Sequence, residues 1–362
     1  MSDSAATTLA DPVALAKATA TARKRIWGWW WFDWASQPYN TLLITFIFGP
    51  YVVGVVGDGS RAQAIWGYGI GAAGVLLAVL APLLGAVADR SGKRMGFIWF
   101  FSALYVIGAW ALWYSAPADF NIWFVMAMFC LGLIGMEFAT IFTNAMLPDL
   151  APREELGKVS GSGWAWGYVG GLVALILMLT LLAEGSNGKT LIGIDPIFGL
   201  DAETREGTRS VGPLTAIWYV VFMVPFFLWV REPRKPDAVS IGAAISGAWP
   251  ELKTTLMGLP RNRSLFAFLG SSMFYRDALN GVYTFGGIYA AGVLGWSVVQ
   301  IGIFDCGDGA TTMTDLAVAR DGALWGVSAD DVWPLDAPHG EVGREVVAGR
   351  VHVVRRLERV GG

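Results

Sequence analysis

The chain has 362 residues, of which 54% are hydrophobic and only 15% are charged, and its formal net charge is −3. A soluble domain of this length carries far more charge on its surface, and so small a net charge gives no reason to expect a nucleic-acid partner. The composition therefore excludes an ordinary soluble protein and favours a protein whose main partner is a lipid bilayer.

The N-terminal segment, residues 1–25, is small, polar and rich in alanine, and it ends in Arg23, Lys24 and Arg25. It lacks the apolar core of a cleavable signal peptide. We therefore expect residues 1–25 to be disordered or weakly helical, and we expect the first membrane span to act as the signal anchor.

Long apolar runs follow this segment. A helix needs about 20 apolar residues to cross the hydrocarbon core, and each crossing must be helical because backbone groups in lipid have no water to bond. An eighth run begins near Trp296 and is interrupted at Asp305. Complete spans are predicted at residues 36–56, 65–88, 96–115, 121–145, 163–183, 214–230 and 266–292.

The basic residues gather on alternate connections between the spans. If the N-terminus is cytoplasmic, fifteen Lys and Arg residues lie on the inner segments, and four lie on the outer segments. Inner loops of membrane proteins carry such an excess. We therefore expect an integral multi-pass protein with a cytoplasmic N-terminus, in the inner cell membrane if the source is bacterial. The four outer residues are Arg61, Lys189, Arg205 and Arg209.

The spans also suggest a division of the chain into parts. Six spans, a long inner loop and then further spans is the layout of a transporter built from two halves. The expected parts are the cytoplasmic N-terminus 1–25, a six-helix half 26–231, a linker loop 232–262, the start of a second half 263–304 and a non-membrane tail 305–362.

The tail differs from the spans in character. Its short apolar runs 316–318, 323–327 and 331–336 predict β-strands, with a hairpin turn at Arg320-Asp-Gly322. A further strand is predicted at 351–354. Two or three such strands cannot bury a core on their own.

A polar loop joins the second and third spans, and it reads Gly85-Ala-Val-Ala-Asp89-Arg90-Ser-Gly92-Lys93-Arg94. It resembles the signature loop of the major facilitator superfamily in residues, spacing and position. The resemblance implies that Asp89 and Arg90 help to lock a cytoplasmic gate through charge-assisted hydrogen bonds that differ between two states. In the superfamily this lock also engages a helix of the second half, which is absent here. A tight turn with positive-inside charges is the structural alternative.

Four further segments narrow the resemblance. Together they look like the vacuolar amino-acid effluxer branch of the superfamily, the autophagy-related permeases and their bacterial relatives, over residues 25–304. This implies an all-α membrane protein with a major-facilitator-like helical bundle, in which a complete six-helix half precedes an incomplete second half. It also implies about four more spans, so the C-terminal part is missing or replaced, and a short β-prone tail stands there. The segments are 31–40, 144–155, 157–171 and 285–295.

Polar side chains inside the first and fourth spans are candidates for a substrate or proton pathway, because ionisable groups at membrane depth are costly and usually functional. Glu137 precedes Asn144 by seven residues, so the two share one helix face. Asp33 and Asn40 lie at the entry of the first span. Two of them have a structural alternative: a hydrogen bond from Glu137 to a neighbouring helix, and capping of the first helix by Asp33.

The seventh predicted span carries the adjacent pair Arg276 and Asp277, with Asn280 one turn from Arg276. An amino-acid-like substrate needs one cationic and one anionic partner, so this pair is a candidate substrate site. In the fifth span Gly163, Gly167 and Gly171 recur every four residues, a spacing that lets a neighbouring helix approach closely.

These observations predict a secondary active transporter that moves amino acids or similar small solutes and is coupled to a solute gradient. No catalytic or metal-binding constellation is visible, so we expect neither an enzyme nor a bound cofactor. Residues 184–190 carry part of a phosphate-binding loop without its first Gly or a preceding strand, so nucleotide binding is not expected. The alternative is a truncated or chimeric membrane remnant, or an assembly subunit that packs with a partner chain.

Overall fold

The structure is a computed structural model that describes residues 12–185, 187–232, 237–292, 315–318, 324–327 and 332–334. It divides into two units, residues 1–302 and residues 303–362. The first unit is a helical bundle, and the second contains a small antiparallel sheet.

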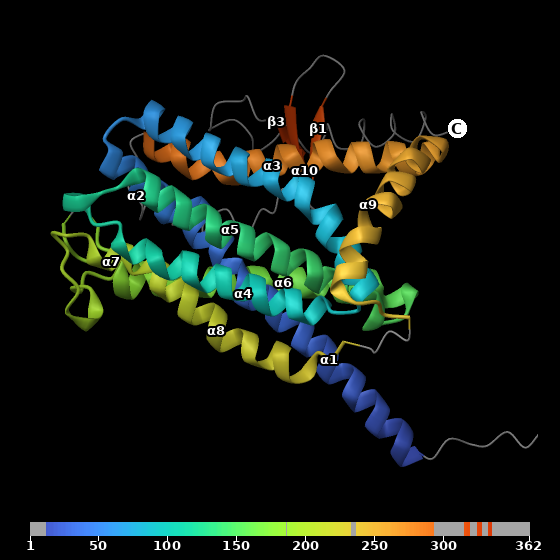
Figure 1. Cartoon of the computed structure of the whole chain (residues 1–362). Helices are drawn as coiled ribbons and strands as arrows, with labels where there is room; N and C mark the ends of the chain where they lie inside the picture. The colour runs from blue at the N-terminus through green and yellow to red at the C-terminus, as the bar shows by residue number, and fades with distance from the viewer. Residues whose placement is uncertain are drawn as a thin grey trace, which may run out of the picture. The chain divides into compact units, whose positions relative to one another are not determined.

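Six helices in the described part of the chain are long and apolar enough to cross a membrane (Figure 1). The six spans confirm an α-helical, multi-pass membrane protein. They cover Ala20–Val56, Gly59–Ser91, Arg94–Tyr114, Ile122–Asp149, Leu156–Leu182 and Glu206–Trp229.

Most spans consist of a main helix with a short irregular turn at one end. The spanning elements are α1 (Pro12–Pro38), the π-helix η1 (Tyr39–Phe46), α2 (Phe48–Val56), α3 (Gly59–Ser91), α4 (Arg94–Ala111), η2 (Leu112–Tyr114), α5 (Ile122–Asn144), η4 (Leu147–Asp149), α6 (Leu156–Leu177), the π-helix η6 (Met178–Leu182), α7 (Glu206–Arg209) and α8 (Val211–Trp229). Further 3-10 turns in the connections are η3 (Pro117–Asp119), η5 (Arg153–Glu155), η7 (Ile197–Gly199) and η8 (Leu259–Arg261).

Local sequence explains where several of these helices begin. The Asp58 side chain accepts a hydrogen bond from Arg61 N at the start of α3, and the Asn121 side chain accepts from the backbone of residues 123 and 124 at the start of α5. Such N-caps satisfy backbone N–H groups that have no partner inside the helix.

Two expectations about the N-terminal region are corrected. Helix α1 already begins at Pro12, so the part of segment 1–25 from residue 12 on is helical and the disordered alternative is wrong there. Asp33 therefore lies within α1 and cannot be the N-cap of the first helix. Apolar runs do not predict this helix start, because the residues before Arg25 include many polar ones. Their alanine content nevertheless favours a helix.

The predicted linker loop 232–262 is also corrected, because it contains the 18-residue helix α9 (Ile241–Gly258). The Ser240 hydroxyl caps this helix by accepting a hydrogen bond from Ala243 N at 3.4 Å. The next helix, α10 (Arg263–Gly292), contains the predicted span 266–292. It is not among the six apolar helices of the described residues, and the charged pair Arg276 and Asp277 lies at its middle.

Glycine residues allow helices of the bundle to pack closely. Helix α4 lies against α5, and a Cβ on Gly108 would overlap the Gly132 backbone and lie 2.6 Å from the Met128 carbonyl oxygen. A Cβ on Gly135 would lie 2.7 Å from Phe101 O. Close backbone approach of this kind is how membrane helices associate without a hydrophobic driving force.

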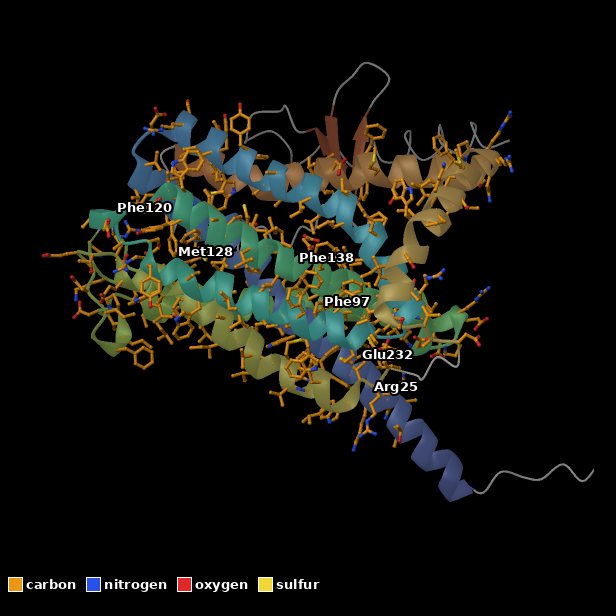
Figure 2. All side chains as sticks on the ribbon, in the orientation of Figure 1. Arg25, Phe97, Phe120, Met128, Phe138 and Glu232 are labelled. Carbon is orange, nitrogen blue, oxygen red and sulfur yellow. The ribbon has the colours of Figure 1, made fainter. Side chains whose placement is uncertain are left out.

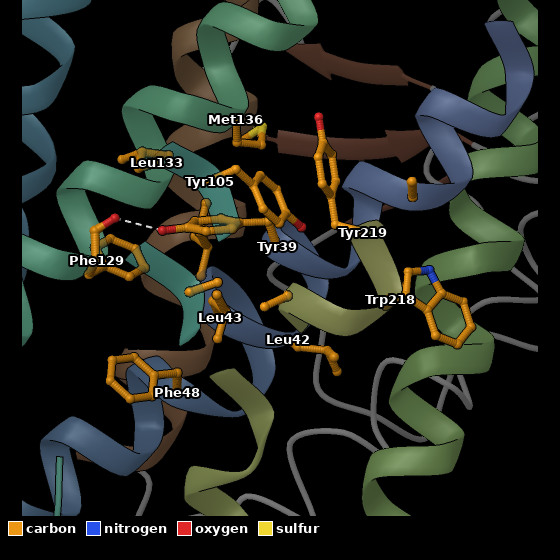
Figure 3. Close-up of a cluster of buried hydrophobic side chains, with 14 of the residues drawn as sticks. Tyr39, Leu42, Leu43, Phe48, Tyr105, Phe129, Leu133, Met136, Trp218 and Tyr219 are labelled. Carbon is orange, nitrogen blue, oxygen red and sulfur yellow. Dashed lines mark hydrogen bonds between the residues drawn. The ribbon is translucent and has the colours of Figure 1, made fainter. Parts of the chain in front are cut away.

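Aromatic side chains fill the centre of the bundle and carry its polar contacts (Figure 3). The Tyr39 hydroxyl donates to Phe129 O at 2.6 Å, which links η1 to α5. Indole N–H groups make similar links to backbone carbonyl oxygens. Trp29 donates to Thr143 O at 3.0 Å, Trp30 to Val159 O at 2.9 Å and Trp218 to Trp34 O at 3.1 Å.

A second polar cluster holds the connection between η6 and α7. Glu184 accepts hydrogen bonds from Arg205 Nε at 2.7 Å, Thr208 Oγ1 at 2.6 Å and Thr208 N at 2.9 Å. Its side chain is almost completely buried. The segment that resembled a phosphate-binding loop thus begins with a structural carboxylate.

The tail unit contains three antiparallel strands in the order β1 (Asp315–Val318), β2 (Leu324–Val327) and β3 (Val332–Pro334). Leu316 pairs with Gly326, and Gly326 pairs with Trp333. The short strands predicted in this region are therefore confirmed, whereas the strand predicted at 351–354 lies outside the described residues.

The glycine contact between α4 and α5 yields a test. Gly108→Ala should lower the free energy of unfolding by about 1–3 kcal/mol, because the new methyl group overlaps the facing backbone. Gly74→Ala is the matched control, because a Cβ on Gly74 meets nothing within 4 Å. It should leave stability unchanged or raise it slightly, since Ala favours helix over Gly. Thermal unfolding of the purified proteins in detergent measures both, and equal losses would contradict the packing described.

Candidate functional site

The candidate site surrounds the turn between α3 and α4. Helix α3 ends at Ser91, and Gly92 follows with φ +58°, a left-handed conformation that glycine adopts without strain. This explains why the predicted gating loop needs a Gly at this position. A Cβ on Gly85, the other glycine of the loop motif, would meet nothing within 4 Å.

Arg94 is the centre of the site. Its guanidinium donates to Asp89 Oδ1 from Nη2 at 2.7 Å and from Nε at 2.9 Å. Its Nη1 donates to Asp149 Oδ2 at 3.1 Å, at the end of the fourth span. One cation therefore ties α3, α4 and η4 together through charge-assisted hydrogen bonds. All three side chains keep some contact with solvent, so each ion pair alone is weak.

Glu232, directly after the sixth span, reaches the start of α4. Its carboxylate accepts hydrogen bonds from Arg94 N at 2.8 Å and from Met95 N at 3.0 Å. Glu232 thus acts as an N-cap that comes from a distant part of the chain. Its negative charge is stabilised by the positive end of the α4 helix dipole. Figure 2 shows Glu232 and Arg25 at the same end of the bundle, away from Phe120.

Arg90 faces the linker helix. Its carbonyl oxygen accepts a hydrogen bond from Val239 N at 3.1 Å, and its guanidinium lies against Gly247 of α9. A Cβ at Gly247 would lie 2.5 Å from Arg90 Nη2. Lys93 occupies the position before α4 and makes no side-chain cap there.

Several residues of this cluster were not singled out from the sequence. Arg25 Nη2 donates to the backbone oxygen of Asp149 at 3.2 Å, so the N-terminal part of the first span joins the cluster as well. Asp149 and Glu232 could have been found, because each carboxylate lies within a few residues of the end of an apolar run, on the side with most basic residues. Gly247 carries no comparable signal.

Asp33 lies at the contact between α1 and α6. A Cβ on Gly163 would lie 2.7 Å from Asp33 Oδ2, and a Cβ on Gly167 would lie 3.1 Å from the Asp33 Cβ. A Cβ on Gly171 would lie 2.5 Å from Thr41 Oγ1 in the same interface. Asp33 Oδ2 is buried and has no hydrogen-bond partner within the described residues.

Asn40 lies in the π-helix η1, an irregular stretch in the middle of the first span. Its carbonyl oxygen accepts a hydrogen bond from Thr45 Oγ1 at 3.0 Å. Irregular turns of this type inside helices frequently occur at functional sites.

The remaining polar candidates are not joined into one cluster. Glu137 in α5 is half-buried and Asn144 at the end of α5 is exposed. In α10, Arg276 and Asp277 are both exposed, and the Asn280 side chain lies outside what the structure describes. Over the described residues no ion pair connects Arg276 or Asp277 to Asp33 or Glu137.

Comparison with known proteins places these features in a family context. The family described as "Vacuole effluxer Atg22 like" matches residues 48–319. This confirms the resemblance drawn from the sequence, although residues 31–40 lie before the match. An uncharacterized MFS-type transporter, YxiO of Bacillus subtilis (strain 168), is 24% identical over 274 residues, which are 73% of this chain. The chain spans 59% of the length of YxiO.

Two other similarities are more limited. An uncharacterized protein of Aquifex aeolicus (strain VF5) is 35% identical over 107 residues, which are 29% of this chain and 26% of that protein. The inward-open structure of the xylose transporter XylE from E. coli has 14% sequence identity and a TM-score of 0.41, and the match covers 67% of this chain and 56% of that chain.

The capping contact of Glu232 can be tested directly. Glu232→Ala removes the acceptor of two backbone N–H groups, so the first turn of α4 should lose about 0.5–2 kcal/mol of local stability. Hydrogen–deuterium exchange of the purified protein should then be faster at Arg94 and Met95.

Glu154→Ala is the control, because Glu154 is exposed and lies in η5, in the connection that begins with Asp149. It should leave exchange at Arg94 and Met95 unchanged. Equal acceleration in both variants would mean that Glu232 does not cap α4.

Proposed function

We propose a transport function from one premise: the chain belongs to the Atg22-like vacuole effluxer family. It is a secondary active transporter of the major-facilitator type that moves amino acids or similar small solutes and is driven by a solute gradient. The observation that carries the proposal is the family match over residues 48–319, in a chain with six membrane-length helices.

The cluster around Arg94 supports a gating role. It joins the ends of the first, second, third, fourth and sixth spans through hydrogen bonds from two guanidinium groups, those of Arg25 and Arg94, and from the backbone at the start of α4 to carboxylate or carbonyl oxygens. Such bonds are individually weak where solvent reaches them. They can therefore be exchanged for others when the transporter changes state, because a small difference in contact energy shifts a two-state equilibrium.

In this proposal the cluster is the cytoplasmic gate, and the N-terminus is cytoplasmic. The excess of Lys and Arg at this end supports that orientation. The gating residues are Gly85, Asp89, Arg90, Gly92, Lys93 and Arg94, joined by Asp149 and Glu232.

Asp33 and Glu137 are the proposed proton-binding groups. An ionised carboxylate in an apolar environment needs a partner, and a group without one takes up a proton instead. Asp33 Oδ2 is buried without a partner among the described residues, and Glu137 makes no hydrogen bond or ion pair there. A group of this kind can release its proton when a conformational change brings it into contact with water.

The substrate pathway is proposed to run between the first span, the fourth span and helix α10. Asn40 and Asn144 supply uncharged hydrogen-bonding groups. Arg276 is proposed to pair with the carboxylate of an amino acid and Asp277 with its ammonium group. Asn280 lies on the same helix.

Transport by the purified chain is the test. We expect proteoliposomes that contain the full chain to take up radiolabelled amino acids when a pH gradient is imposed, and to take up little without it. Asp33→Asn and Glu137→Gln should each reduce gradient-driven uptake by roughly 5- to 150-fold, the range that typical coupling free energies produce.

Asp195→Asn is the matched control, since Asp195 is a highly exposed carboxylate that pairs with Lys189 on an exposed loop. Its uptake should equal that of the unchanged protein. Uptake that persists without a gradient in all variants would refute proton coupling. Absence of uptake in the unchanged, folded protein would refute transport by this chain alone and favour the assembly-subunit alternative.

A further inference from the structure

Helix α9 has two apolar faces, of which the bundle covers only one. Ala244 and Ala248 are buried, and they pack with Val87 of α3. Gly247 on the same side receives the Arg90 guanidinium. This inner face attaches α9 to the end of α3, next to the turn that holds Arg94.

The other face of α9 is apolar and uncovered by the described residues. Ile245 and Trp249 are each 60% exposed, and Leu256 is 52% exposed. Together with Ile241 these residues are spaced by four, four and seven positions, which is one or two helical turns, so they form one stripe along the helix. The stripe is defined here as Ile241, Ile245, Trp249 and Leu256.

Basic side chains accompany the stripe. Residues 241–263 contain Lys253, Arg261 and Arg263, and Glu251 is the one acidic residue among them. The three basic residues are exposed. An apolar stripe with a Trp, followed by exposed positive charge, is the pattern of helices that lie in the surface of a membrane with anionic lipids.

The place of α9 in the fold agrees with such a position. It contacts the end of α3, where the second span leaves the hydrocarbon core, and it leads into α10 through η8. Figure 1 shows α9 crossing the end of α3 and turning into α10. A helix at this level meets the headgroup region, where Trp rings are enriched.

We propose that α9 is an interfacial helix that binds anionic phospholipid on the membrane face at the Arg94 end of the bundle. The stripe enters the boundary between headgroups and acyl chains, and Lys253, Arg261 and Arg263 contact lipid phosphates. Because α9 also contacts Arg90, lipid binding at this face affects the turn between α3 and α4. The lipid-binding step depends on membrane insertion and holds whether or not the chain transports a solute.

The test uses the full chain in nanodiscs that hold one copy, with Cys130 and Cys306 changed to Ala. A fluorophore is attached at Ile245→Cys on the stripe or, as the matched control, at Ser246→Cys. Ser246 is the next residue, is also exposed, and lies about 100° around the helix. Quenching is measured with nitroxide-labelled lipid and with iodide in the water.

In nanodiscs that contain phosphatidylglycerol, we expect lipid quenching to be several-fold stronger at position 245 than at position 246, and iodide quenching to be weaker. Changing Lys253, Arg261 and Arg263 to Gln should lower lipid quenching at 245 to the value seen in phosphatidylcholine alone. Equal access of iodide to both positions would overturn the proposal, because the stripe would face water. Protection from both quenchers at 245 would also overturn it, because protein would then cover the stripe.

Discussion

Water is absent from the hydrocarbon core, so each polar group that the chain carries into it must find its partner within the protein. This constraint makes the spans helical, and it also selects the contacts between them. Trp29 donates its indole N–H to a carbonyl oxygen of the fourth span, and Tyr39 donates its hydroxyl to Phe129 O. These side chains combine a large apolar surface with one hydrogen-bond donor, which suits a bundle that has no solvent to satisfy it.

Packing follows from the same absence of water. Because lipid tails are as apolar as the side chains, helices gain little from burying apolar surface and depend on close contact instead. Gly108 and Gly132 bring α4 against α5, and Gly163 and Gly167 bring α6 against Asp33 of α1. The second contact places a carboxylate between two helices without a hydrogen-bond partner among the described residues. The most unusual polar group of the bundle thus depends on the smallest residues for its position.

At the ends of the spans the side chains are in contact with water, and charged groups make the contacts between helices. Arg94 holds two carboxylates, and Glu232 caps the helix that Arg94 begins. Solvent weakens each of these bonds, so each contributes little to stability on its own. The connection around Glu184 differs, because that carboxylate is buried and fully hydrogen-bonded, and breaking a buried pair is far more costly. The two polar clusters therefore differ in the free energy needed to break them.

Apolar runs predicted seven complete spans, of which the structure confirms six as membrane-length helices, while the seventh, 266–292, lies in α10, which is not among them over the described residues. The apolar runs, the Gly92 turn and the Asp89-Arg90 motif were sufficient to predict the all-α fold and the family, because each depends on local sequence and on the length of a bilayer crossing. The start of α1 at Pro12 was missed because its residues are too polar to stand out as an apolar run. Helix α9 was missed because Glu251 and Lys253 interrupt its apolar residues well before the length of a crossing. The partner of Asp89 was also out of reach. Arg94 donates two hydrogen bonds to it, and the other carboxylates that Arg94 and its backbone contact, Asp149 and Glu232, lie 55 and 138 residues further along the chain. Only tertiary structure could decide these pairings, because charged side chains are free to choose among several partners and the folded helices determine which of them lie within reach.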